Sequence, residues 1–232
     1  MKNLKIEALI IAVGLLFGGY FVGSGINNMA KPERTVYVKG LAEMEVKANH
    51  VTWPILFKQA GNDLYELCER VDESNGVIVD FLKSEGISED EISINPPEVY
   101  DTNTDRYSDK DAEFRYNITS VIIVSSDKVD LVRELVNRQG ELLNNGIVID
   151  SDYRYNLDYE YTELNSVKPK MIEEATKNAR AAAEKFAVDS ESELGKIKQA
   201  SQGQFEIYDR DANTPYIKNI RVVTSLTYYL ED

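Results

Sequence analysis

Two early stretches of the chain alternate between apolar and polar residues. Residues 35–47 place a small or apolar side chain at every second position, and residues 50–58 repeat this pattern around Trp53. A period of two indicates strands that bury one face. Pro54 has no amide proton, so the second strand is predicted to lie at an edge or to contain a bulge.

The hydrophobic period then changes to three and four residues, which is typical of amphipathic helices. The first such helix covers residues 64–82 and is predicted to end at Gly86. The second begins at a Ser126/Asp127 cap and stops at Gly146. The third starts near Ser166 with Pro169 in its first turn. Its stripe is rich in alanine, which lets a helix lie close to a sheet: Ile172, Ala175, Ala179, Ala182, Ala183, Phe186 and Ala187.

Further strands are predicted over residues 91–100, 113–125, 147–161, 194–207 and 218–230. The element order is therefore ββαββαβαββ. Long strands with one apolar face, many of them in hairpins, favour antiparallel sheets. We expect an α+β protein in which about three helices back these sheets.

The N-terminus carries a membrane signal. Residues 8–30 contain no charged side chain, and about 20 apolar residues suffice to cross a bilayer. Lys2 and Lys5 precede this run, so the N-terminus is expected to stay in the cytoplasm. A cleaved signal peptide is the alternative, but Asn28-Met29-Ala30 is a poor cleavage site. We therefore expect a transmembrane signal anchor in residues 1–30 and an exported domain in residues 31–232.

Composition narrows the possible functions. The chain of 232 residues has a net charge of −14, with one His and one Cys. This acidity disfavours nucleic acid as a partner, because phosphate binding requires a basic surface. A single Cys excludes an internal disulfide and multi-cysteine metal sites. Most familiar types of enzyme catalysis therefore lack the residues that they require.

Several motifs follow one another along the chain. Tyr37-Val-Lys-Gly40 opens the first strand, and Phe81-Leu-Lys-Ser-Glu-Gly-Ile87 ends the first helix. The longest motif is Ala175-Thr-Lys-Asn-Ala-Arg-Ala-Ala-Ala-Glu-Lys-Phe-Ala187, which is followed by Leu194-Gly-Lys-Ile197. In this order and spacing the motifs resemble the SIMPL domain over about residues 34–232, and the longest motif is the fullest match.

The resemblance implies an exported bacterial protein of the group that includes the periplasmic oxidative-stress defence protein and the periplasmic immunogenic protein. At least one member assembles into a large hollow ring-like oligomer. No catalytic residues are established for the family, so none carries over. This chain departs from the commoner members in its anchor-like N-terminus and in its acidic stretch at residues 101–111.

Three features are candidate sites. Asp101, Asn103 and Asp105 have the opening spacing of a calcium loop, but Arg106 and Ala112 occupy its Gly and acidic positions, which favours a solvated loop. His50 and Cys68 could form an activated thiolate pair. The position of Cys68 beside Leu64, Leu67 and Val71 instead predicts a buried thiol, and His50 is then a turn residue. Four tyrosines are expected to share one strand face, either as core or as a binding or radical-scavenging surface: Tyr153, Tyr155, Tyr159 and Tyr161.

The sequence therefore predicts a non-enzymatic envelope protein with no catalytic, cofactor or metal site. It is expected to be a homo-oligomer, held at the bacterial inner membrane by residues 1–30, with its C-terminal domain in the periplasm. Its link to oxidative-stress defence rests on the resemblance. The alternative is a thiol-dependent protective activity centred on Cys68.

Overall fold

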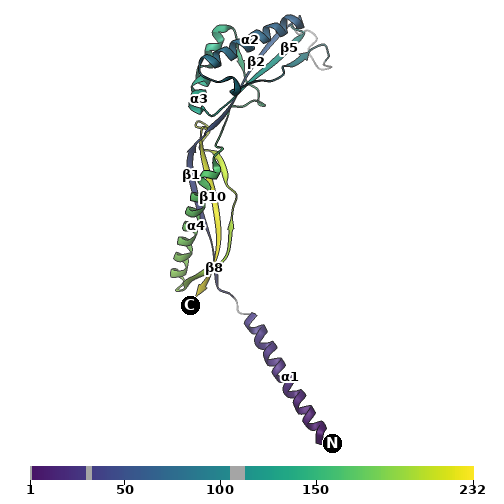
Figure 1. Cartoon of the computed structure of the whole chain (residues 1–232), viewed down its shortest axis with the longest axis vertical. Helices are drawn as coiled ribbons and strands as arrows, with labels where there is room; N and C mark the ends of the chain where they lie inside the picture. The colour runs from purple at the N-terminus through teal and green to yellow at the C-terminus, as the bar shows by residue number, and fades with distance from the viewer. Residues whose placement is uncertain (1, 30–32, 105–112) are drawn as a thin grey trace. The chain divides into compact units, whose positions relative to one another are not determined.

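The protein is described by a computed structural model that covers residues 2–29, 33–104 and 113–232, with the side chains of its first helix covered over residues 9–24. The chain forms two compact units. Unit 1 contains Met1–Leu41, Glu173–Gly203 and Val223–Asp232. Unit 2 contains Ala42–Ile172 and Gln204–Val222. Strands β1 (Thr35–Lys47) and β10 (Ile217–Glu231) and helix α4 (Leu164–Asp189) contribute residues to both units (Figure 1).

A six-stranded antiparallel sheet organises unit 2. Its central strands, β2 (His50–Gly61) and β5 (Tyr116–Ser126), pair without a break from Val51 and Ser126 to Gly61 and Tyr116. Strands β3 (Ile92–Ile94) and β4 (Glu98–Asp101) pair with β5, while β6 (Ile149–Asp150) and β7 (Asp158–Glu160) pair with β2. The sheet therefore joins segments that are far apart in the sequence.

Two helices bury the apolar face of this sheet. Helix α2 (Leu64–Ser84) contacts β2 and β5, and α3 (Val129–Arg138) contacts β2 (Figure 1). Asp63 caps α2 by accepting hydrogen bonds from the amides of Tyr65 and Glu66, which satisfies donors left free at a helix start. Short 3₁₀ helices follow each helix, η1 (Glu89–Glu91) after α2 and η2 (Gln139–Asn145) after α3.

A smaller sheet runs through unit 1, in the order β1–β10–β8, where β8 is Glu193–Gln202. In unit 2, β10 also pairs with β9 (Glu206–Asp209). The unit 1 core consists of Val38, Leu226 and Tyr228 from the sheet and Ala179 and Ala183 from α4. Figure 1 shows α4 running beside β1 and β10. The alanines let the helix backbone approach the sheet closely, as the sequence predicts.

The predicted α+β class is confirmed, since the described residues form antiparallel sheets and four α-helices, whereas the predicted element order is confirmed only in part. The periodic elements also lie where expected. β1 occupies residues 35–47, α2 begins at residue 64, and Gly86 turns the chain after α2 with a left-handed φ of 98°. Two predicted strands are split, because Pro96 and Pro97 separate β3 from β4 and a short gap separates β8 from β9.

The predicted strand over residues 147–161 is wrong. Only β6 and β7 form there, and the residues between them make a turn in which the Tyr155 amide donates to the Asp152 carbonyl. The Asp152 side chain also accepts a hydrogen bond from the Arg154 amide. Asp favours such local turns, and this preference overrides the alternation of the tyrosines.

Three smaller predictions also need correction. Pro54 lies in a central strand, β2, whose pairing with β5 contains no bulge. On the other edge of β2, Pro54 falls between the residues that pair with β6 and those that pair with β7. Pro169 is the sixth residue of α4, not part of its first turn. Phe186 is 58% exposed, because the buried stripe of α4 advances in steps of four residues through Met171, Ala175, Ala179, Ala183 and Ala187.

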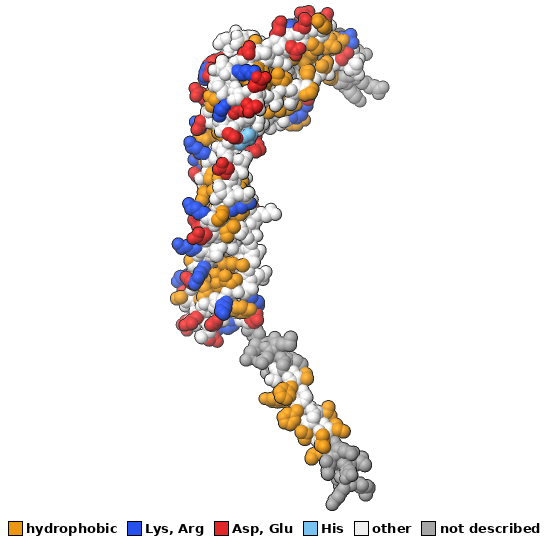
Figure 2. Space-filling model, in the orientation of Figure 1, with side chains coloured by type: hydrophobic (Ala, Val, Ile, Leu, Met, Phe, Trp, Pro, Cys, Tyr) orange, Lys and Arg blue, Asp and Glu red, His pale blue; other side chains and the backbone are white. Residues whose placement is uncertain are grey.

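The N-terminal segment forms a helix, α1 (Lys2–Met29), as predicted. Its described side chains, at residues 9–24, are exposed and mostly apolar (Figure 2). Over the residues that the structure describes, no helix reaches both the length and the apolar character required of a membrane span. The helix itself is therefore confirmed, while its assignment as transmembrane is not.

Candidate functional site

The most distinctive surface of unit 1 is the sheet face turned away from α4, which we term the open face. Tyr37 marks this side, because its hydroxyl bonds Ser225 at 3.1 Å while the flanking Val38 is buried against α4. The β10–β8 register and the contact of Lys198 with the Tyr229 ring extend the face across all three strands. Its members are Tyr37, Lys39, Leu41, Lys198, Gln199, Ser201, Val223, Ser225, Thr227 and Tyr229.

The open face is apolar in part, and its charges nearly balance, because Lys39 and Lys198 are offset by Glu33, the ion-pair partner of Lys198, and by Glu231, two positions after Tyr229 on β10. Tyr37 is 59% exposed and Leu41 is 40% exposed. Lys198 forms an ion pair with Glu33, while Lys39 is exposed. In a chain with a net charge of −14, this face is thus one where like-charge repulsion between copies is weak.

His50 lies at the start of β2 in unit 2 and takes part in two side-chain hydrogen bonds. Its Nδ1 is 2.7 Å from Asp127 Oδ1, and its Nε2 is 3.0 Å from Ser125 Oγ. The expectation of a simple turn residue is therefore wrong. The sequence pairing of His50 with Cys68 is wrong as well, since both ring nitrogens have other partners.

Cys68 is exposed on α2, so the prediction of a buried thiol is also wrong. The buried stripe of α2 passes through Leu67 and Val71, whereas Leu64 in its first turn is 39% exposed. The thiol lies next to this stripe and faces solvent. Leu64 and Asp72, one turn away on either side, supply no cation that would stabilise a thiolate.

The four tyrosines do not share a strand face. Tyr159 is buried in the unit 2 core and contacts the edge of the Tyr216 ring, and burial raises its pKa. Tyr153 is 88% exposed in the turn, and Tyr155 and Tyr161 are half-buried. A tyrosine ladder is therefore absent from this part of the described structure.

The suggested calcium loop is only partly described, because Asp105, Arg106 and Ala112 lie outside the described residues. The Asp101 carboxylate is bound by the Arg115 guanidinium at 2.9 and 3.1 Å, and this pairing lowers its pKa. Over the described residues, no three His, Cys, Asp or Glu side chains gather closely enough to hold a metal ion.

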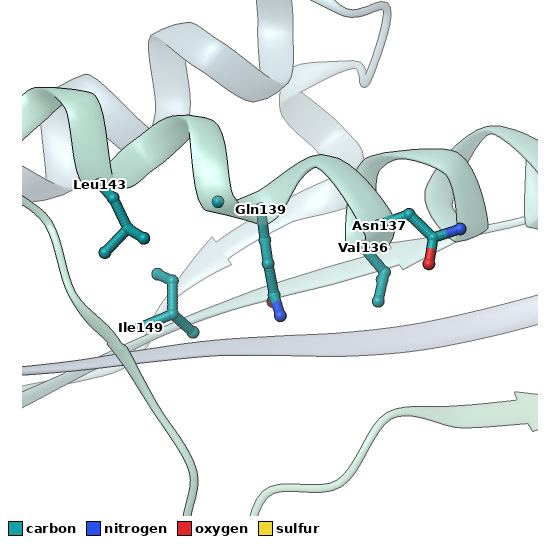
Figure 3. Close-up of a pocket in the computed structure, with 6 residues that line it drawn as sticks. Val136, Asn137, Gln139, Leu143 and Ile149 are labelled. Carbon is teal, nitrogen blue, oxygen red and sulfur yellow. The ribbon is translucent and has the colours of Figure 1, made fainter.

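A shallow pocket of about 480 Å³ lies beside α3 and η2 in unit 2. In Figure 3, Val136, Gln139 and Leu143 point to the same side of the helix, near Ile149 of β6. None of its lining residues is titratable. The residues that line the pocket therefore supply no group for acid–base chemistry.

Sequence reasoning missed Ser125 and Asp127 as partners of His50. His50 is 75 positions from Ser125 and 77 positions from Asp127 in the sequence. Only the pairing of β2 with β5 brings the three residues together. An antiparallel pairing of the two predicted strands, 50–58 and 113–125, would have placed the end of the second strand beside His50.

Comparison with known proteins supports one assignment. No curated protein matches the chain. The model of the SIMPL family, described as a protein of unknown function (DUF541), matches residues 36–224 and so spans residues of both units. The motifs at the start of β1 and along α4 lie inside this match. The chain therefore belongs to the SIMPL family.

Proposed function

We propose that this chain is a non-enzymatic protein of the bacterial envelope that acts through self-association of its open face. In this proposal α1 holds the chain in the inner membrane and the remainder lies on the periplasmic side. A contribution to oxidative-stress defence is part of the proposal and rests on the family resemblance.

The open face carries the proposal. Tyrosine and leucine side chains that are exposed on one chain lose contact with water when a second copy covers them, at about 25 cal/mol per Å² of apolar area. Tyrosine is also common in interface cores, where its ring packs and its hydroxyl keeps a hydrogen bond. Tyr37 already bonds Ser225, so association need not leave its hydroxyl unpaired.

A second copy is the occupant that this surface fits best. The two lysines of this face are offset by Glu33 and Glu231, whereas other parts of the surface carry the acidic excess of the chain. Two copies that meet here approach through a nearly neutral surface, where like-charge repulsion is weak. A basic partner would instead be drawn to the acidic surface elsewhere.

Membrane attachment is supported by the residue pattern of α1. The uncharged run 8–30 follows Lys2 and Lys5, the arrangement that leaves an N-terminus in the cytoplasm. Exposed apolar side chains over residues 9–24 are also costly in water and favourable in lipid. Anchoring would raise the local concentration of copies and so favour self-association.

Substitution of Tyr37 by glutamate tests the open face. We expect the Tyr37→Glu chain, extracted in mild detergent, to self-associate about 10-fold more weakly than the wild type, because the interface would bury a charge. Analytical ultracentrifugation would measure this. Tyr65→Glu is the matched control, since Tyr65 is 76% exposed on α2 in unit 2. Equal weakening by both variants would contradict the assignment to the open face.

The exposure of Cys68 favours one second candidate, a thiol-dependent protective activity. An accessible thiol can be oxidised by peroxide to a sulfenic acid, which a buried thiol resists. If this activity is the function, cells that carry Cys68→Ser should lose about as much peroxide survival as cells that lack the protein. Survival equal to wild type would eliminate this candidate and leave the first intact.

A further inference from the structure

His50, Ser125 and Asp127 form a continuous hydrogen-bonded series at one end of the unit 2 sheet. Asp127 Oδ1 lies 2.7 Å from His50 Nδ1, and His50 Nε2 lies 3.0 Å from Ser125 Oγ. An Asp carboxylate accepts the Nδ1–H of the ring, which leaves Nε2 free to accept the Ser125 hydroxyl proton. The three groups thus connect in the order carboxylate, imidazole, hydroxyl.

The sheet register explains why these side chains meet. Val51 pairs with Ser126, so the next step outward places His50 opposite Asp127. Ser125 is the penultimate residue of β5 and Asp127 directly follows its last residue, so both reach His50 from the same end of the strand. On its other side, His50 pairs with Glu160 of β7, so its backbone is held between two strands. The arrangement therefore joins the paired ends of β2 and β5 to the bend that precedes α3.

This connectivity is the one that activates a serine as a nucleophile. A base within hydrogen-bond reach of the hydroxyl, itself oriented by a third group, is the general signature of nucleophilic activation. Access is open, because Ser125 is exposed and the His50 side chain is 25% exposed. The Asp127 side chain is 87% exposed, so water weakens its pull on the imidazole compared with a buried carboxylate.

We propose that Ser125 is a covalent acyl-acceptor site for small activated esters. Ser125 Oγ attacks the ester carbonyl carbon and forms a new C–O bond, while the bond from that carbon to the leaving oxygen breaks. His50 Nε2 takes the hydroxyl proton and gives it to the departing alkoxide or phenoxide. Asp127 is a positioning residue that holds the ring tautomer. The step ends at the ester on Ser125, so it modifies the chain without turnover and stands independently of the proposed self-association.

The test uses p-nitrophenyl acetate with the full chain in detergent. Release of p-nitrophenolate gives the rate, and peptide mass spectrometry gives the position of the acetyl group. We expect one acetyl group per chain on Ser125 and none at that peptide in Ser125→Ala. The rate at Ser125 should fall about 100-fold in His50→Gln and about 10-fold in Asp127→Asn. Ser93, an exposed strand serine of β3, is the internal reference for unassisted acetylation.

Two results would overturn the proposal. One is acetylation of Ser125 no faster than that of Ser93 in the wild-type chain. The other is an unchanged Ser125 rate in His50→Gln, provided that the circular dichroism spectrum and unfolding midpoint of the variant match those of the wild type. A purely structural hydrogen bond would leave the Ser125 rate unchanged in His50→Gln.

Discussion

Replacing Gly40 with alanine is expected to destabilise unit 1 by about 3 kcal/mol. Gly40 lies in β1 where α4 crosses most closely. A Cβ there would fall far inside the van der Waals distance of Ala175 O and Ala179 N, and 2.8 Å from Ala179 Cβ. Two of these atoms belong to the helix backbone, so no side-chain rotation relieves the clash. Helix α4 must move away from the sheet and lose the packing of its alanine stripe.

Hydrogen exchange followed by mass spectrometry would measure this effect in the affected unit. Peptides from α4 and the C-terminal half of β10 should lose protection in Gly40→Ala. Trp53 fluorescence is the wrong probe here, since Trp53 lies in the unit 2 core. Gly76→Ala in α2 is the matched control, because no atom lies within 4 Å of its added Cβ, and helix propensity should stabilise it by about 0.5–1 kcal/mol. Unchanged α4 protection in Gly40→Ala would contradict the described packing.

Replacing Glu91 with glutamine should destabilise unit 2 by about 2–3 kcal/mol at neutral pH. The Glu91 carboxylate is 2.7 Å from Lys128 Nζ, and it accepts hydrogen bonds from Ser126 Oγ at 2.6 Å and the Ser88 amide at 2.7 Å. Burial disfavours its charge, but these three partners outweigh burial and lower its pKa from 4.5 to about 2. The cluster ties the segment after α2 to the start of α3.

The lowered pKa of Glu91 predicts the direction of the pH dependence. Because the folded value lies below the unfolded value of 4.5, the stabilisation is complete above about pH 4.5 and is lost as the pH falls toward 2. Unfolding followed by Trp53 fluorescence should therefore show a smaller difference between wild type and Glu91→Gln at pH 3 than at pH 7. Glu89→Gln is the control, since its side chain is 86% exposed and its pair with Lys83 is worth at most about 0.5 kcal/mol. A difference that stays constant with pH would show that Glu91 does not act through its charge.

The parts of the fold that sequence predicts well are those with an unbroken period. β1 keeps its alternation over thirteen residues and α2 keeps its apolar stripe over 21, so burial of one face determines each element. Residues 147–161 show the limit of this reasoning. Their tyrosines alternate as in a strand, but Asp152 forms local hydrogen bonds that favour a turn. Hydrophobic periodicity alone does not show that the turn is preferred over the strand.

The candidate sites were harder to predict, because they depend on how the strands pair and on which sheet faces and helix sides other elements cover. Ser125 meets His50 only through the pairing of β2 with β5, which no local pattern encodes. Cys68 lies at the border of the α2 stripe, where a shift of one position on the helix changes a buried residue to an exposed one. The open face also reads as an ordinary half-buried strand in sequence, because alternation does not reveal whether a second layer covers the polar side.

The most direct test of the proposed self-association is the native mass of the full chain in a mild detergent, measured by sedimentation over a range of concentrations. We expect a discrete multiple of the 26.3 kDa chain mass once bound detergent is subtracted. The multiple should persist at physiological salt, which screens the repulsion between chains of net charge −14. A mass that stays at one chain per micelle up to high protein concentration would contradict the central claim.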